Sequence, residues 1–315
     1  MNAKARILSL IILLLVSGCS NKSVPPAEVT PTLTPFQVNV ESPTATPGAL
    51  QAGSPPPAVT SISVSSLTFT PAPGTMPSDF SPILYGRRYD ANMFFSLLGG
   101  VQGGKWLTAD QAASNMSGGW DYDVHTFAGE SFQVYGSAAR FSPPYRGFYV
   151  STDVTVNEYG MVGVAHGWNI RQDVVEELLP ENETYRQVVF DWLKTEGIKD
   201  PEAGDIHIYR VDLEADGVDE IFISATHLDG QHTAQAGDYS IILMRKVVGN
   251  EAVTLPIVSD VYDSQEIAFP NAYLPSNFID LNQDGILELV VDVQRWEADG
   301  AAVYQVNGQQ IIRVF

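Results

Sequence analysis

Residues 280–291 read Asp-Leu-Asn-Gln-Asp-Gly-Ile-Leu-Glu-Leu-Val-Val, and residues 212–223 read Asp-Leu-Glu-Ala-Asp-Gly-Val-Asp-Glu-Ile-Phe-Ile. Counted from its first aspartate, each stretch has an oxygen-bearing side chain at positions 1, 3, 5 and 9 and a glycine at position 6. Apolar residues, most of them β-branched or aromatic, follow position 9 and predict a β-strand. The two stretches begin 68 residues apart (280 minus 212), so this part of the chain is expected to contain a structural repeat.

Similar strand patterns follow both acidic stretches. After the first, apolar residues predict strands at 239–248 and 253–259, and after the second at 302–306 and 310–315. A glycine turn separates the members of each pair. Each repeat is therefore expected to form a four-stranded antiparallel sheet like one blade of a β-propeller. Because a closed propeller has typically about four to eight blades, two repeats predict open sheets or a sandwich instead.

The oxygen spacing of the two acidic loops, residues 212–220 and 280–288, suits a calcium ion. The first three oxygen-bearing side chains can point into one turn, glycine at position 6 permits the positive φ of the reversal, and the carboxylate at position 9 returns to the same point. Hard oxygen ligands suit Ca²⁺ better than a transition metal. The alternative is an ordinary hairpin, since Asp-Gly between apolar strands is by itself a strong turn signal.

The loops are not EF-hands, because position 12 is Ile223 or Val291 where an EF-hand has glutamate. They resemble the Asp-x-Asp-x-Asp-Gly-x-x-Asp loops of the FG-GAP and VCBS families, as in the integrin α propeller. Glu at position 9 of both loops, and at position 3 of the first, is longer than the family residue. The resemblance implies eight calcium ligands, four in each loop: Asp280, Asn282, Asp284 and Glu288, and Asp212, Glu214, Asp216 and Glu220.

Half of the aromatic residues of the chain lie in residues 81–170. Short alternating stretches there predict strands at 120–127, 131–138, 147–155 and 161–166. Thr108 and Gln111 predict a capping box at the start of a short helix. Most of the aromatic side chains are expected in the core. Four have polar or glycine neighbours and are predicted to be exposed, where they could stack on sugar rings: Trp120, Tyr122, Tyr145 and Trp168.

An amphipathic helix is predicted at residues 181–196. Its apolar residues recur every three or four positions, Asn182 is a candidate N-cap, and Gly197 is a stop signal. The predicted fold class is therefore mainly β (α+β), with antiparallel sheets or a sandwich and one packed helix. We expect an aromatic-rich β domain at residues 81–170, followed by a domain at residues 171–315 that contains the helix and both repeats.

The first residues have the layout of a secretory signal. Basic residues precede an apolar run at 7–16, which is shorter than the roughly 20 residues that span a bilayer. The tetrad Val-Ser-Gly-Cys that ends at Cys19 resembles the lipobox of bacterial lipoproteins. This resemblance implies a signal peptide at 1–18 and a lipid on Cys19. The alternative, an ordinary secretory signal, leaves a free thiol in an exported protein, since Cys19 is the one cysteine of the chain.

Residues 19–80 are expected to form a disordered linker, because twelve of the twenty prolines fall in residues 21–80 among Thr and Ser. Removal of Lys4 and Arg6 with the signal leaves 15 basic against 37 acidic residues, a formal charge of 15 − 37 = −22. Such a charge disfavours nucleic acid as a partner and favours divalent cations. We expect an extracytoplasmic protein that its N-terminal lipid holds on a bacterial membrane.

Common enzyme motifs are absent from the sequence: it has no Gly-x-Ser-x-Gly elbow, His-Glu-x-x-His helix, P-loop or dinucleotide fingerprint. His227 and His232 could belong to a zinc site, but loop histidines without a third ligand are more often solvated. Glu176 and Glu177 are expected on a solvated face, although a glycosidase needs only two acids that the fold brings together. Three functions stay open. The leading one is a non-catalytic surface lipoprotein whose calcium-stabilised β domain binds an unidentified protein or polysaccharide. The others are a carbohydrate-binding lipoprotein and an extracellular hydrolase of a type without these motifs.

The lipobox predicts that Cys19 alone carries the membrane association. A Cys19→Ala variant should move from the detergent phase to the aqueous phase when cell extracts are partitioned with Triton X-114, because it lacks the acyl chains. A Ser17→Thr variant, which keeps the cysteine, is the control. A Cys19→Ala variant that stays in the detergent phase would contradict the anchor.

Overall fold

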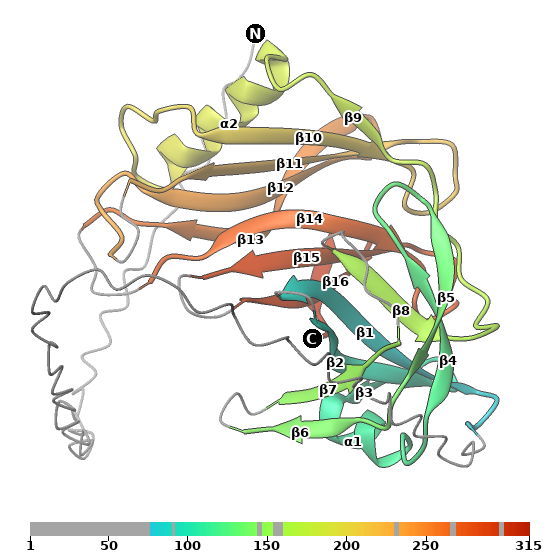
Figure 1. Ribbon diagram of the computed structural model, residues 1–315. Helices are drawn as coiled ribbons and strands as arrows, with labels where there is room; N and C mark the ends of the chain where they lie inside the picture. The colour runs from blue at the N-terminus through green and yellow to red at the C-terminus, as the bar shows by residue number, and fades with distance from the viewer. Residues whose placement is uncertain are drawn as a thin grey trace, which may run out of the picture. The chain divides into compact units, whose positions relative to one another are not determined.

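The computed structural model describes residues 76–89, 92–143, 147–153, 160–229, 233–264, 269–295 and 299–315, and all of them belong to one compact unit. The predicted signal peptide, Cys19 and the linker as far as residue 75 lie outside the described residues. The same holds for Tyr145 and His232. The described chain is mainly β, with several antiparallel sheets and two helices, as the sequence predicts (Figure 1).

Each repeat forms a four-stranded antiparallel meander within the described residues. The first-repeat sheet has the order β13-β12-β11-β10-β9, in which β9 is added at one edge, and the second-repeat sheet has the order β14-β15-β16-β17. In both, the acidic loop joins the first two strands of the meander. The strand bounds are β9 (Glu176–Leu178), β10 (Asp205–Val211), β11 (Glu220–His227), β12 (Tyr239–Val248) and β13 (Glu251–Val261), then β14 (Ala272–Ile279), β15 (Glu288–Gln294), β16 (Asp299–Asn307) and β17 (Gln310–Arg313).

Two strands of the repeat sheets contain a proline beside a bulge. In β13 the register with β12 shifts next to Pro256, and in β14 the register with β15 shifts next to Pro275. Both strands lie at the end of the strand order of their sheet. Proline lacks an N–H, so it is compatible with such an edge position, where no ladder hydrogen bond is lost.

The N-terminal sheet has the order β5-β4-β8-β1-β2-β7-β6, with β3 beside β2. It curls far enough for Gly136 in β5 to form a bridge with Thr152, just after β7. This contact is a single bridge, and the described strands do not form a closed barrel. The strands are β1 (Phe80–Tyr89), β2 (Asn92–Gln102), β3 (Lys105–Thr108), β4 (Trp120–His125), β5 (Ser131–Gly136), β6 (Arg140–Ser142), β7 (Gly147–Ser151) and β8 (Met161–Ala165).

Both predicted helices are present. The first, α1 (Ala109–Ser114), begins after Thr108, and the predicted capping box with Gln111 is formed. The second, α2 (Glu183–Thr195), begins after Asn182, whose side chain caps it. It ends before Gly197, which has a φ of 103°. No helix among the described residues combines the length and apolar character needed to cross a membrane.

The second-repeat sheet is buried on both faces. Phe278 and Leu289 face the first-repeat sheet, where they share a core with Phe222. The neighbouring residues Ile279 and Val290 point to the opposite face and pack against the N-terminal sheet. Successive residues of a strand face opposite sides, so a sheet buried on both faces requires an unbroken apolar run. This explains the sequence Leu-Val-Val that follows the second acidic loop.

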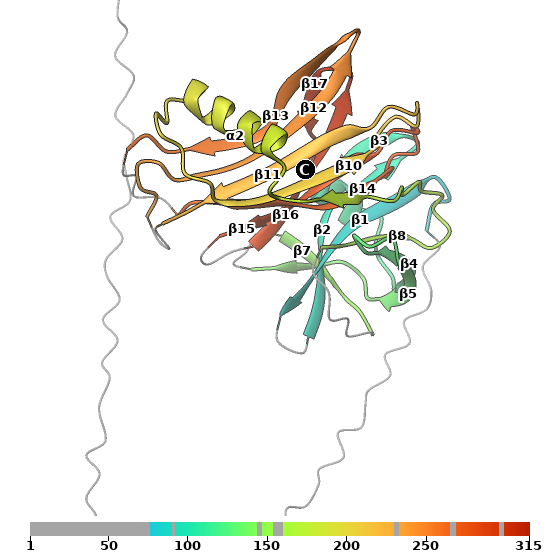
Figure 2. The ribbon, with the colours of Figure 1, turned by 90° about the horizontal axis from the view of Figure 1, so that it is seen from above.

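The helix α2 covers the remaining face of the first-repeat sheet, where Val189 and Leu193 meet Ile223 and Ile241. The layers are therefore α2, the first-repeat sheet, the second-repeat sheet and the N-terminal sheet. Figures 1 and 2 show this succession, with α2 lying over the first-repeat sheet when it is seen from above. Both acidic loops belong to the two inner interfaces through Leu213 and Leu281, which are fully buried.

The layered core predicts which aromatic residue the fold depends on. Phe278 is fully buried and its ring centroid lies 4.8 Å from that of Phe222 across the two repeat sheets. Phe278→Ala should lower the free energy of unfolding by about 3 to 5 kcal/mol, because it leaves a cavity. Phe94, 44% exposed, contacts Tyr149 edge to face, so Phe94→Ala should cost less than about 1.5 kcal/mol. Urea denaturation measures both values, and equal losses would contradict this assignment of the core.

Candidate metal centre

The two acidic loops have the same backbone scaffold. In each, the carboxylate at position 1 accepts the N–H groups of positions 5 and 6, and the carboxylate at position 5 accepts that of position 7. These bonds are 3.2, 2.8 and 2.8 Å long in the first loop and 3.2, 3.0 and 2.8 Å in the second. The glycine at position 6 has a positive φ in both loops, 83° and 89°. The predicted reversal is therefore present twice.

The carboxylate at position 9 closes each loop. Glu220 accepts the N–H of Leu213 at 3.1 Å, and Glu288 accepts the N–H of Leu281 at 2.8 Å. Each glutamate is the first residue of its strand, β11 or β15, and each is buried. Position 9 thus ties the beginning of the loop to the strand that follows it.

The second loop contains buried oxygen atoms without a counter-charge. Asp280 and Asn282 are 5% and 8% exposed, and Glu288 is 0% exposed. One oxygen of Glu288, Oε1, has no hydrogen-bond partner among the described residues. Burial raises the pKa of Glu288 to about 8, and the nearby carboxylates of Asp284 and Asp280 add to the rise. Burying an unpaired carboxylate is costly, so this loop favours the binding of a cation.

The second loop fits a hard divalent cation such as Ca²⁺. Its side chains at positions 1, 3, 5 and 9 all offer oxygen, the donor that calcium prefers. Asp284 at position 5 is exposed, which leaves a route from solvent. Its Oδ2 accepts hydrogen bonds from the amides of Asn282 and Gln305, each at 3.0 Å. These neutral donors leave the negative charge of the loop in place.

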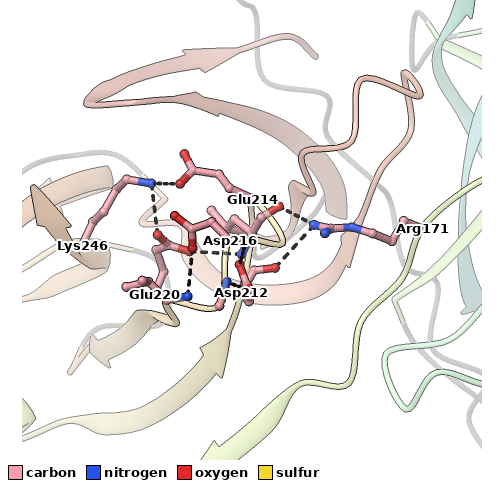
Figure 3. A network of polar contacts seen from close by, with 9 residues as sticks. Arg171, Asp212, Glu214, Asp216, Glu220 and Lys246 are labelled. Carbon is pink, nitrogen blue, oxygen red and sulfur yellow. Dashed lines mark hydrogen bonds and ion pairs between the residues drawn. The ribbon is translucent and has the colours of Figure 1, made fainter.

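The first loop differs because a lysine lies within it (Figure 3). The ammonium of Lys246 lies 2.6 Å from Glu214 Oε2 and 3.0 Å from Glu220 Oε1, and Lys246 is only 8% exposed. Burial lowers the pKa of Lys246, but its bonds to the two glutamates outweigh that effect and leave the pKa above its ordinary value. Burial also raises the pKa of Glu220. Hydrogen bonds from the N–H of Leu213 and from the Lys246 ammonium lower it, but they do not cancel the rise.

Arg171 connects the two loops. Its guanidinium Nη2 donates to the carbonyl oxygens of Asp212 and Leu213, as Figure 3 shows, and its own carbonyl accepts the N–H of Asp280 at 2.8 Å. The N–H of Leu287 also donates to the carbonyl of Leu213 at 3.0 Å. The loops are therefore neighbours, and each restrains the backbone of the other.

The predicted exposure of Trp120 and Tyr122 is wrong. Trp120 is 7% exposed and Tyr122 is fully buried, and both belong to the core of the N-terminal sheet. Their polar neighbours Asp121 and Asp123 alternate with them along β4 and face the other side. Polar neighbours in a strand therefore accompany a buried residue as readily as an exposed one. These two rings are not available to stack on a sugar.

Trp168 is half-buried and supports the second loop. Its indole N–H donates to the carbonyl of Leu281 at 2.9 Å, and its ring packs against the core between the second-repeat and N-terminal sheets. Trp168 thus makes a structural contact, and its stacking role stays a prediction. Tyr145, the fourth predicted residue, lies outside the described residues.

The sequence offers His227 and His232 as a zinc pair, but His232 lies outside the described residues. His227 lies close to Asp229 and Asp238, and the three side chains could approach one ion. However, both oxygens of the buried Asp238 already accept backbone N–H groups, from Asp229 and Gln235, so Asp238 braces its own loop. Asp238 and Lys246 carry no local sequence signal. Their partners are set by strand pairing and loop closure.

The pair Glu176 and Glu177 does not converge. Glu176 forms an ion pair with Arg210, whereas Glu177 lies 3.3 Å from His207. The two glutamates are adjacent in β9 and therefore point to opposite faces. They cannot act together on one glycosidic bond, which requires two acids on either side of it.

Comparisons with known proteins leave the site to be interpreted from its geometry. No family model, curated protein or solved structure matches the chain. The likeness of the loops to the FG-GAP and VCBS pattern thus stays a prediction from their spacing. The buried oxygen of Glu288 is an independent observation in favour of a cation.

The position of Arg171 predicts that its guanidinium contributes to stability. Arg171→Met removes the donor to the carbonyls of Asp212 and Leu213, so it should lower the free energy of unfolding by about 1 to 3 kcal/mol. Arg140→Met is the control, because Arg140 is exposed on the short strand β6 and should change stability by less than about 0.5 kcal/mol. Urea denaturation measures the free energy of unfolding of both variants. Equal values for the two variants would contradict the role of Arg171 in joining the loops.

Proposed function

We propose that this protein is a non-catalytic surface lipoprotein whose folded part is a calcium-stabilised β scaffold. The observation that carries the calcium assignment is Glu288 Oε1, which is buried, has no partner among the described residues and lies in a loop of oxygen donors. The calcium ligands are Asp280, Asn282, Asp284 and Glu288. The lipid on Cys19 and the proline-rich linker hold the scaffold at the extracytoplasmic face of a membrane.

Calcium is the cation that the donor set favours. The four side chains offer oxygen and no nitrogen or sulfur ligand, which argues against a transition metal. Magnesium requires nearly ideal octahedral geometry and gives up its water reluctantly, so it is the weaker candidate. Typical extracellular calcium modules have dissociation constants of about 0.1 to 1 mM, which suits a site exposed to the outside of the cell.

The position of the loop explains how a cation would stabilise the fold. Asp280 directly follows β14 and Glu288 is the first residue of β15, so one ion held by both would join the two strands. These strands belong to the second-repeat sheet, which is packed on both faces. Calcium bound there would therefore act on the central layer of the protein.

A binding role is favoured over the two alternative functions. The burial of Trp120 and Tyr122 removes two of the rings that supported sugar binding. Glu176 and Glu177 have separate partners, Arg210 and His207, and do not form the facing acid pair of a glycosidase. A hollow between α2 and the strands β12 and β13 includes one acid, Asp191, among its lining residues. We propose that the scaffold displays a surface for a protein or polysaccharide partner.

The proposal predicts stabilisation by calcium. With dissociation constants of about 0.1 to 1 mM, 1 mM Ca²⁺ should add about 0.4 to 1.4 kcal/mol of stability, a rise of a few degrees in Tm. Asp284→Asn should lose this gain, whereas Asp263→Asn, an exposed aspartate away from both loops, should keep it. Mg²⁺ should give a smaller shift than Ca²⁺.

Thermal melting of the full mature chain in detergent, with Ca²⁺, with Mg²⁺ and with EDTA, measures these shifts. Calorimetric titration with calcium provides an independent readout. The same Tm in all three solutions, together with no heat on titration, would overturn the calcium assignment.

A further inference from the structure

We propose that Lys246 is the built-in cation of the first acidic loop, and that one register position, Lys246 in the first repeat and Gln305 in the second, decides which loop takes calcium. This inference rests on the proposed calcium site in the second loop. It predicts one calcium ion for each chain, although the sequence offers two acidic loops of equal spacing.

Strand pairing shows that Lys246 and Gln305 are equivalent. Ile221 pairs with Arg245 in the first-repeat sheet, and Leu289 pairs with Tyr304 in the second. Both pairs are antiparallel, so the next step along each brings the position 9 glutamate opposite the residue after Arg245 or Tyr304. Glu220 therefore faces Lys246, and Glu288 faces Gln305.

The two equivalent residues make different contacts. The Lys246 ammonium bonds to the carboxylates at positions 3 and 9 of the first loop, at 2.6 and 3.0 Å. The amide of Gln305 instead donates to Asp284 at position 5, at 3.0 Å. As a result Glu220 Oε1 has a cationic partner, whereas Glu288 Oε1 has none among the described residues. The Lys246 ammonium thus supplies the buried position 9 carboxylate of the first loop with a counter-charge from within the chain.

The residue at position 3 of the loop also differs between the two repeats, as does the residue opposite position 9. In the first loop it is Glu214, whose longer side chain reaches the ammonium, and in the second it is Asn282, whose amide bonds to Asp284 instead. A charged pair, Glu214 with Lys246, thus corresponds to a pair of amides, Asn282 with Gln305. The unusual glutamate at position 3 is explained by the lysine that it contacts.

A tethered ammonium excludes calcium by position and by charge. Its nitrogen lies within bonding distance of two of the four side chains that would hold the metal, and Lys246 is almost completely buried. Calcium could enter only if the ammonium left both carboxylates, since two cations at one place repel each other. Because the lysine is part of the chain, its effective concentration at the loop does not fall when the protein is diluted.

Calorimetric titration with calcium tests the inference on the full mature chain in detergent. The wild type should bind one ion, Lys246→Gln should bind two, and Gln305→Lys should bind none or bind at least about tenfold more weakly. Arg245→Gln is the matched control: Arg245 precedes Lys246 in β12, bonds to Thr254, and should leave the count at one. A wild type that binds two ions, or a folded Lys246→Gln variant that still binds one, would overturn the inference.

A second variant covers the case in which Lys246→Gln does not fold. The double variant Glu214→Asn with Lys246→Gln gives the first loop the same residues at these two positions as the second loop, and should fold and bind two ions. If it binds one, the inference is wrong. In EDTA, Gln305→Lys should melt at a higher temperature than the wild type, because its ammonium can pair with Glu288.

The outcomes separate the inference from the proposed function. If the wild type binds one ion that Asp284→Asn removes and Asp216→Asn leaves, both stand. If Asp216→Asn removes the ion and Asp284→Asn leaves it, calcium binding stands but the role of Lys246 is wrong. If the wild type binds no ion and Lys246→Gln gains one, the role of Lys246 stands and the calcium site of the second loop is wrong.

Discussion

The fold depends on the buried glutamate that closes each acidic loop. Glu220 and Glu288 accept a backbone N–H from the second residue of their own loop while each begins a strand. In both loops a carboxylate accepts this bond inside the protein, where an ionised carboxylate is costly without a counter-charge. The two repeats meet the same cost in different ways, one with Lys246 and the other, as we propose, with calcium. The asymmetry of the repeats therefore follows from a single electrostatic requirement.

The layered core explains why this requirement has consequences beyond the loops. The second-repeat sheet has a core on each face, and the second loop joins two of its strands. The first loop lies against the second through Arg171 and Leu287. A change at either loop is thus transmitted to backbone that several layers share. The charge balance at Glu288 and the apolar cores on both faces therefore act on the same element, the second-repeat sheet.

Much of the fold was predictable because its signals are local. The capping box at Thr108, the Asn182 cap and the strand at 239–248 were found with the predicted residues. The hairpin of β1 and β2 was missed, since its glycines suggest loops. A side chain at Gly99 would collide with the ring of Phe315, a contact that joins distant parts of the chain. The contact between Lys246 and Glu220 was also missed, because the two residues are distant in sequence and only strand pairing brings them together. The spacing of the oxygens predicted the shape of both loops, but the register of the neighbouring strand determines which of them lacks a cation.

The prolines in β13 and β14 have a consequence for how copies of the chain meet one another. An exposed sheet edge offers free backbone groups on which a strand of another molecule can add, and this is a common beginning of aggregation. In the described part of the chain, Pro256 and Pro275 interrupt two of these edges, and four others are formed by the short strands β3, β6, β9 and β17. The remaining one, β5, bonds to Thr152. Copies of the chain that meet in solution would therefore offer each other few templates for intermolecular β-sheet.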